Sequence, residues 1–291
     1  MKKLSVVIAF MLVLCSCAKA PEEPEVPEVP EVNEEPAPEI VEETPEPEPE
    51  PEPVMTEEEI NALSNDSFGW GFVKKPGAPS EFTKGQRDMM EKYSCIYEGS
   101  ADGKPLYLTF DEGYENGYTA VILDTLKEKG VTAAFFVTGP YIDGNADLIR
   151  RMLDEGHIVG NHTVRHPNMP SLGTAEAMEN EINELDLKFY EAFGEHLTYF
   201  RPPEGAYSER SLAAANAAGC KTVLWSFAYR DWERDNQKGA GYAKDSVIPY
   251  LYGGSVLLLH AVSSDNASAL GDIIDSAREQ GFTFKSLDEF K

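Results

Sequence analysis

The segment LYLTFDEG, residues 106–113, decides the fold class of this chain. Its apolar and β-branched residues predict a short buried strand over Leu106–Phe110. Two carboxylates, Asp111 and Glu112, come next, ahead of a glycine-containing turn. A helical pattern follows over Tyr118–Lys129 and ends at a glycine. A strand, a turn and a helix in this order form one unit of a parallel α/β sheet.

Apolar runs and helical periodicity continue to alternate to the end of the chain. The further strands expected are Thr132–Val137, His157–Gly160, Thr222–Trp225, Ser255–His260 and Phe282–Phe284. The further helices expected are Asp147–Glu155, Thr174–Phe193, Ser208–Ala218 and Ala267–Gln280. Regular alternation indicates an α/β fold with a parallel sheet, either open or closed into a barrel. About 190 residues are few for a complete eight-stranded barrel, so we expect a distorted, reduced (β/α) barrel.

Ionisable side chains follow five of the apolar segments. They are Asp111 with Glu112, His162 with His166, Arg201, Asp231 and His260. In parallel α/β folds the carboxyl ends of the strands meet at one edge of the sheet, where reactive groups lie. Five segments that each deliver such a group to this edge predict an active site.

His162 and His166 stand four residues apart. One helical turn at this spacing would place both imidazoles on the same side, where they could bind one metal ion. Two histidines and a carboxylate form a common catalytic metal set that leaves room for water and substrate. Alone, the pair is more typical of exposed loop histidines, but the carboxylates that end another strand favour the metal. A second carboxylate could then take a proton from metal-bound water, whose pKa is about 7 on zinc.

Five motifs occur in order along the chain. They are TFDEG at 109–113, NHTVRH at 161–166, RPPEG at 201–205, Asp231-Trp232 and LLH at 258–260. Together they resemble the motifs of the polysaccharide deacetylase family (NodB homology, carbohydrate esterase family 4) over roughly residues 104–291.

Three further stretches resemble one branch of that family. They are FGWGF at 68–72, YENGY at 114–118 and VSSDNA at 262–267. The branch is the sporulation-type peptidoglycan N-acetylmuramic acid deacetylases of the muramic δ-lactam pathway.

The resemblance implies a hydrolase that removes an N-acetyl group through a tetrahedral oxyanion. The catalytic residues that it implies are Asp111 as general base, Arg201 as its orienting partner, His260 as general acid and Asp231 as the carboxylate that tunes the pKa of His260. The metal ligands that it implies are Glu112, His162 and His166, for a divalent ion that we expect to be zinc. The substrate-binding residues expected are Leu258 and Trp232 as apolar walls of the acetyl pocket, Pro203, and Glu204, whose backbone N–H would help to stabilise the oxyanion.

Three positions depart from the family pattern. Glu112 stands where the family has an aspartate that binds the metal, and its side chain is one methylene longer. Glu204 replaces the tyrosine that usually follows the paired prolines, and Ala228 replaces the first aspartate of the fourth motif. Only the change at Glu112 touches the expected metal site.

The first sixty residues have a composition of their own. Residues 1–16, with an apolar run too short to span a bilayer, predict an export signal. The motif LCSC at 14–17 resembles the bacterial lipoprotein box, with Cys17 as the lipidated residue, and the alternative is a plain secretory signal. Residues 17–60 predict a disordered linker, because 17 of the 51 acidic residues and 11 of the 20 prolines lie within 21–60. Residues 61–103 are expected to be an N-terminal extension of a catalytic domain at 104–291.

Charge and composition restrict the partners. A net charge of −26 argues against nucleic acid, which needs clustered lysine and arginine. The expected partners are peptidoglycan glycan strands and, through Cys17, the membrane. We expect a monomer on the outer face of the cytoplasmic membrane, or else a protein secreted to the cell wall. A disulfide between Cys95 and Cys220 is permitted outside the cell, although Cys220 is more typical of a buried thiol.

Other functions stay open at this point. The chain could act on N-acetylglucosamine or on a secreted polysaccharide, or it could be a degenerate module that binds glycans without turnover. The joint presence of Asp111, Arg201, Asp231 and His260 disfavours the module, since binding alone needs neither a base nor an acid.

Overall fold

A computed structural model describes residues 55–291 of the chain. The expected export signal, Cys17 and nearly all of the proline- and glutamate-rich linker lie outside the described residues. Within the described part, no helix has the length and apolar character needed to cross a membrane.

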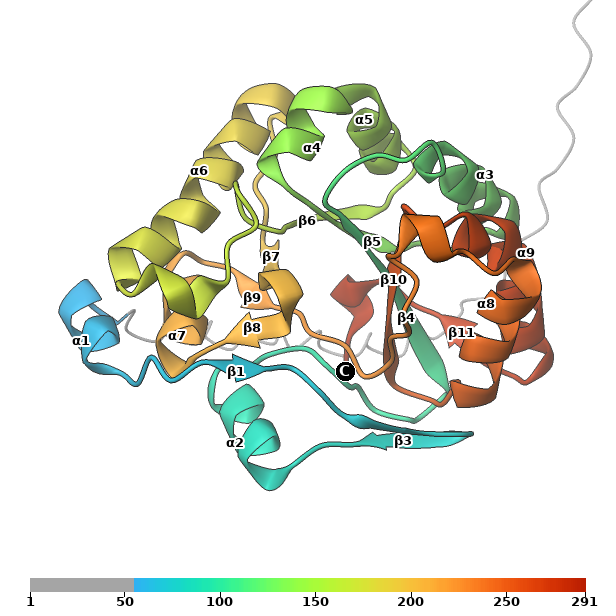
Figure 1. Cartoon of the computed structure of the whole chain (residues 1–291), viewed down its shortest axis with the longest axis horizontal. Coiled ribbons are helices and arrows are strands. Elements are labelled where there is room, and N and C mark those ends of the chain that lie inside the picture. Colours follow the sequence, from blue (N-terminus) through green and yellow to red (C-terminus); the bar gives the residue numbers. More distant parts are fainter. Residues whose placement is uncertain (1–54) are drawn as a thin grey trace, which may run out of the picture. The chain divides into compact units, whose positions relative to one another are not determined.

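A seven-stranded parallel sheet forms the centre of the fold, in the order β10-β4-β5-β6-β7-β9 with β11 beside β4 (Figure 1). Its strands are β4 (Pro105–Glu112), β5 (Ala134–Val137), β6 (Ile158–Asn161), β7 (Tyr199–Phe200), β9 (Lys221–Thr222), β10 (Ser255–His260) and β11 (Thr283–Phe284). Every residue of β4 is buried, as its apolar sequence predicts for an inner strand of a parallel sheet.

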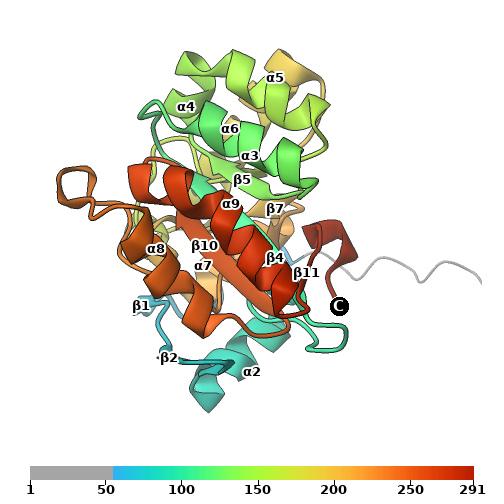
Figure 2. The same cartoon turned by 90° about the vertical axis from the view of Figure 1, so that its right-hand side faces the viewer.

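Helices cover the outer side of the curled sheet (Figures 1 and 2). They are α3 (Thr119–Lys129), α4 (Gly139–Gly144), α5 (Ala146–Asp154), α6 (Ala175–Phe193), α7 (Glu209–Ala217), α8 (Ala240–Val247) and α9 (Ser264–Glu279). Gly130 ends α3 in the left-handed conformation, with φ of 59°, which explains why a glycine stands there.

The segment 223–227 closes the curl between β9 and β10. Val223 pairs with Ile96 and Phe227 pairs with Leu257 of β10, each through an isolated bridge rather than a regular ladder. The strand expected over Thr222–Trp225 is therefore mostly this irregular closing segment. The architecture confirms the expected distorted, reduced barrel, which takes the form of a curled half-barrel.

The N-terminal extension packs into the same folded unit. Its elements are α1 (Glu57–Ala62), β1 (Phe68–Gly69), β2 (Val73–Lys75), β3 (Ala78–Glu81) and α2 (Lys84–Lys92), and it pairs with β8 (Ala206–Tyr207). Helix α1 begins before the expected boundary at residue 61, and Ile60 is fully buried, so the prediction of a disordered linker is wrong for residues 57–60. β1 pairs antiparallel with β8, and Trp70 is buried in a cluster with Leu212 of α7 and Met178 of α6. The side chains of Trp70 and Ser80 donate hydrogen bonds to two carbonyls of the closing segment, Trp225 at 2.7 Å and Ser226 at 2.7 Å.

Four helices of the described part, α1, α2, α4 and α8, go beyond the sequence-based expectation. α4 begins and ends at glycines, which favour turns, but Tyr141 within it is fully buried and stabilises the short helix. Cys95 and Cys220 are free thiols, and Cys220 is buried as its position predicted.

Candidate active site

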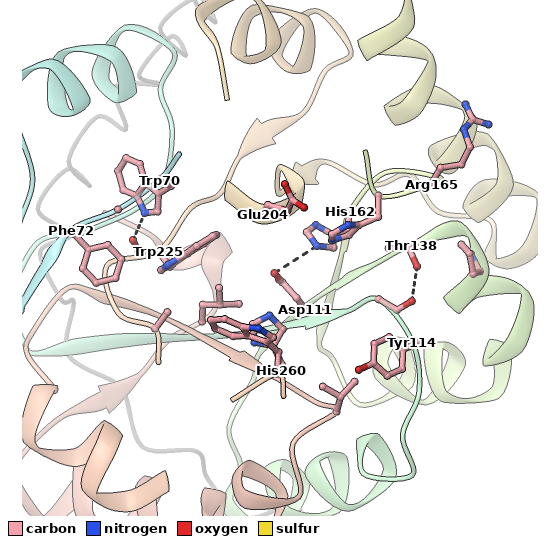
Figure 3. Close-up of a pocket in the computed structure, with 18 of the residues that line it drawn as sticks. Trp70, Phe72, Asp111, Tyr114, Thr138, His162, Arg165, Glu204, Trp225 and His260 are labelled. Atoms are coloured by element: carbon pink, nitrogen blue, oxygen red, sulfur yellow. Dashed lines mark hydrogen bonds and ion pairs between the residues drawn. The ribbon is translucent and has the colours of Figure 1, made fainter. Parts of the chain in front are cut away.

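A cavity of about 910 Å³ collects the side chains at the carboxyl ends of the strands (Figure 3). Seven of the expected site residues line it: Asp111, His162, His166, Glu204, Trp232, Leu258 and His260. Arg201 and Asp231 lie behind this surface, fully or almost fully buried. The sheet therefore brings together residues that are up to 149 positions apart in the sequence, as the strand-end pattern predicts.

Asp111 is held by a buried ion pair with Arg201. The guanidinium Nη1 lies 2.8 Å from Asp111 Oδ1, and Nη2 donates to Thr109 Oγ1 at 2.9 Å. The guanidinium also stacks 4.2 Å from the ring centre of Phe136. Burial by itself would raise the pKa of Asp111, but the charge and hydrogen bond of Arg201, together with His162 and His260, hold that pKa below its usual range. Asp111 is thus a fixed, ionised carboxylate that faces the cavity.

His260 lies beside Asp111, because the register of β10 against β4 pairs the two residues directly. Asp231 Oδ1 lies 2.7 Å from His260 Nδ1, and Asp231 Oδ2 accepts the backbone N–H of His260 at 2.8 Å. Asn266 donates a further hydrogen bond of 2.6 Å to Asp231. Burial lowers the pKa of His260, but the Asp231 carboxylate, with a smaller contribution from Asp111, raises it overall. The geometry favours an imidazolium with Nε2–H available to a ligand.

His162 presents one ring nitrogen to the cavity. Its Nδ1 lies 2.8 Å from the carbonyl oxygen of Arg201, which can only accept, so Nδ1 carries the hydrogen. Nε2 then keeps a free lone pair and lies 3.6 Å from Asp111 Oδ2. Burial lowers the pKa of His162 to about 4 and keeps the ring neutral.

The two histidines meet without a helical turn, so that part of the expectation is wrong. The backbone between them is irregular: Thr163 and His166 have φ of 67° and 58°. Thr163 Oγ1 accepts the His166 N–H at 2.9 Å and holds this bend. The rings are nevertheless adjacent, with centres 4.8 Å apart.

Glu112 does not join these histidines in the structure. Side chains alternate along a strand, so Asp111 faces the cavity and Glu112 faces the helices. The Glu112 carboxyl is fully buried, and Thr119 Oγ1 of α3 donates to it at 3.3 Å. Burial, together with the charge of Glu115, raises its pKa well above the usual range.

The donors at the cavity partly fit a metal ion. His162 fits, because the backbone carbonyl that accepts its Nδ1–H fixes its tautomer, as a hydrogen-bond partner does for a metal-binding histidine, and His166 lies next to it. Among residues 55–291, no three histidine, cysteine or carboxylate side chains converge as a ready ligand set. His162 and His166 thus lie together at the cavity, whereas Glu112 does not line it.

The expected substrate-binding residues lie around the Asp111–Arg201 and Asp231–His260 pairs. Leu258 is buried in the cavity wall, and the half-exposed Trp232 has its ring centre 5.5 Å from that of His260. Glu204 is exposed at the cavity and follows the buried Pro203. Glu204 and Gly205 both have positive φ, 61° and 64°, and an added Cβ at Gly205 would lie 2.8 Å from Trp225, so only glycine fits that position.

Sequence reasoning did not assign Trp70, Phe72, Lys74 and Trp225 to the site, although all four line the cavity. Three of them belong to the N-terminal extension, whose role the sequence left open. The stretch at 68–72 did carry a signal, since it resembles the same branch of the family as the catalytic motifs do.

Comparison with known proteins agrees with this geometry. Residues 98–223 match the family model described as polysaccharide deacetylase. The chain belongs to the polysaccharide deacetylase family, carbohydrate esterase family 4, whose members are generally metal-dependent hydrolases of N-acetyl groups.

The chain is similar to two proteins of this family over most of its length. It is 43% identical to the peptidoglycan-N-acetylmuramic acid deacetylase PdaA of Bacillus subtilis, over 78% of this chain and 87% of that protein. The solved structure of PdaA aligns with a TM-score of 0.76, at 43% identity over 78% of this chain and 98% of the other. A family 4 carbohydrate esterase from Bacillus anthracis aligns with a TM-score of 0.67, at 42% identity over 79% of this chain and 98% of the other.

Proposed function

We propose that the protein hydrolyses the N-acetyl group of N-acetylmuramic acid in peptidoglycan glycan strands. The observation that carries the proposal is the pairing of Asp111 with His260 across β4 and β10, each beside its own ionic partner. The similarity to PdaA supports muramic acid as the sugar.

In this reaction Asp111 acts as the base and His260 as the acid. Asp111 takes a proton from the water that attacks the acetyl carbonyl carbon. When the carbon–nitrogen bond breaks, His260 gives a proton to the departing nitrogen, so the products are acetate and a free amino sugar. Arg201 keeps Asp111 ionised and in place, and Asp231 keeps His260 protonated.

The remaining residues bind and orient the acetyl group. Leu258 and Trp232 offer apolar surface to its methyl group, and the backbone N–H of Glu204 would donate to the developing oxyanion. A divalent ion held by His162 and His166, with zinc well suited to imidazole nitrogen, would supply positive charge for that oxyanion when bound.

Acetate release tests this function. The full chain, stripped with a chelator, is incubated with peptide-free glycan strands in the presence and absence of zinc, and the products are identified by mass spectrometry. We expect zinc-restored release of acetate and deacetylated muramic acid. Deacetylated glucosamine among the products would instead identify N-acetylglucosamine as the substrate sugar. If the chain bound glycan strands but released no acetate from any wall polymer, we would conclude that it is a glycan-binding module and not an enzyme.

We also propose export with a lipid on Cys17, which places the enzyme on the outer face of the membrane, near wall or spore-cortex peptidoglycan. The apolar run that ends in LCSC at 14–17 supports this. Labelled fatty acid should be incorporated into the wild-type chain. Cys17→Ala should abolish the label and move the protein from the membrane fraction to the medium. Equal labelling of both chains would refute lipidation at Cys17.

A further inference from the structure

Lys74 of β2 places its ammonium group in the wall of the cavity. Its Nζ donates to the carbonyl oxygen of Ala228 at 2.8 Å. Nζ also lies 5.0 Å from the ring centres of both Phe227 and Tyr250. These contacts fix the head group and use one of its three N–H donors, so two donors are left for a ligand.

The charge of Lys74 is unbalanced within the protein. Among residues 55–291, no carboxylate forms an ion pair with it. The arginine that lines the cavity, Arg165, already pairs with Glu181 at 2.7 Å, and His260 already pairs with Asp231. Partial burial lowers the pKa of Lys74, because no anion offsets the loss of solvent. A negatively charged ligand would complete this environment.

The position of Lys74 borders the proposed acetyl pocket. The carbonyl of Phe227 accepts the N–H of Leu258 at 2.8 Å, so the chain around Ala228 runs beside β10, and both Ala228 and Leu258 line the cavity. In N-acetylmuramic acid the acetamide is on C2, and the neighbouring C3 carries a lactyl ether with a carboxylate. N-Acetylglucosamine has an uncharged hydroxyl at C3. An acetamide seated against Leu258 would bring the lactyl carboxylate to this edge of the pocket.

We propose that Lys74 is a specificity-determining residue that binds the lactyl carboxylate of N-acetylmuramic acid. The inference rests on the proposed deacetylase function and deepens it, since it assigns the choice of sugar to the N-terminal extension. Trp70 and Phe72 of the same segment lie on one side of the cavity (Figure 3), so this segment supplies a wall of the site as well as its unpaired charge.

The test compares two forms of one substrate. Peptide-free glycan strands are used with their lactyl carboxylates free or converted to methyl amides, and kcat/KM for acetate release is measured with the full chain. Lys74→Met should lower kcat/KM on the free strands by about tenfold to a hundredfold, mainly through KM. On the amidated strands, the kcat/KM of Lys74→Met should equal that of the wild type. Lys74→Arg should retain most of the discrimination.

Lys75→Met is the matched control, because Lys75 is the next residue and pairs with Glu81 away from the cavity. It should leave both substrates unaffected. An equal loss on free and amidated strands in Lys74→Met would mean a merely structural role for Lys74. No loss on either substrate would also overturn the proposal.

Binding separates this proposal from the proposed reaction. In an Asp111→Asn background, Lys74→Met should weaken binding of the free strands by a similar factor and leave the amidated strands unaffected. If the full chain released no acetate while this difference persisted, the proposed reaction would fail and the assignment of Lys74 would stand. If both strand types bound equally with and without Lys74, the assignment would fail whatever the turnover.

Discussion

Asp111 and Glu112 are successive residues of β4, and their carboxyl groups lie on opposite sides of the sheet. Asp111 pairs with Arg201 at the cavity, while Glu112 is buried beneath α3 with Thr119. The same alternation that gives the strand its two faces separates a carboxylate suited to proton transfer from one that has become part of the core.

The placement of Glu112 predicts that zinc binding does not depend on it. We expect Glu112→Gln to bind zinc within about twofold of wild type, because the amide keeps the shape of the buried carboxyl and its bond to Thr119. His162→Ala should weaken zinc binding by about a hundredfold or more. Competition against a chromogenic chelator measures both affinities. Similar losses in the two variants would mean that Glu112 turns towards the ion.

Glu112 also predicts a pH dependence of stability. Its pKa is raised in the folded state, so its stabilising contribution is complete below the ordinary pKa of 4.5 and is lost as the pH rises through the folded pKa. Gln cannot ionise, so wild type should lose stability relative to Glu112→Gln as the pH rises from 4.5. Urea unfolding of both chains across this range measures the difference. A constant difference would show that the carboxyl titrates as it does in the unfolded chain.

Asp231→Asn should change the pH profile of the reaction. The Asp231 carboxylate raises the pKa of His260, and the asparagine removes that charge while keeping a similar shape. A lower pKa would leave His260 deprotonated at neutral pH, where a general acid must be protonated. The alkaline limb of kcat/KM should therefore move to lower pH, with a smaller loss of rate in acid. A uniform loss at every pH would point to misplaced geometry instead.

Arg201 predicts coupled effects on stability and activity. Arg201→Met leaves Asp111 buried without its partner and should cost about 3–5 kcal/mol in the free energy of unfolding. Adding Asp111→Asn removes the unpaired charge, so the double variant should regain much of that stability and still lack activity. Urea unfolding and acetate release measure the two effects. If the stability loss of the double variant equalled the sum of the losses of the two single variants, Arg201 and Asp111 would not be energetically coupled.

Much of the sheet and of the site is predictable from the sequence. The run before Asp111 and the run that ends in His260 are strongly apolar, and parallel topology then brings their carboxyl ends together. The positions of the Asp111–Arg201 and Asp231–His260 pairs follow from that rule and from the family resemblance. Sequence spacing did not predict the non-helical bend between His162 and His166, because the side chain of Thr163 stabilises it locally.

Other features depend on tertiary contacts that no local pattern carries. Tyr141 stabilises α4 through burial, although the flanking glycines favour a turn. Lys74 reaches the site only because a remote segment packs against residues 225–228. The expected strand ended at Phe110, but β4 extends to Glu112, and the alternation of side chains along the strand then turns Glu112 away from the cavity.

The N-terminal extension holds one wall of the site through contacts that do not involve the residues proposed to catalyse the reaction. Trp70, Ser80 and Lys74 hold the carbonyls of Trp225, Ser226 and Ala228 through side chains rather than through a β-ladder. Asp111 and His260, the proposed base and acid, are held independently, by Arg201 and Asp231. Substitutions between residues 68 and 80 can therefore reshape what the enzyme accepts while the reaction itself is conserved, so substrate preference and catalysis are free to diverge along different parts of the chain.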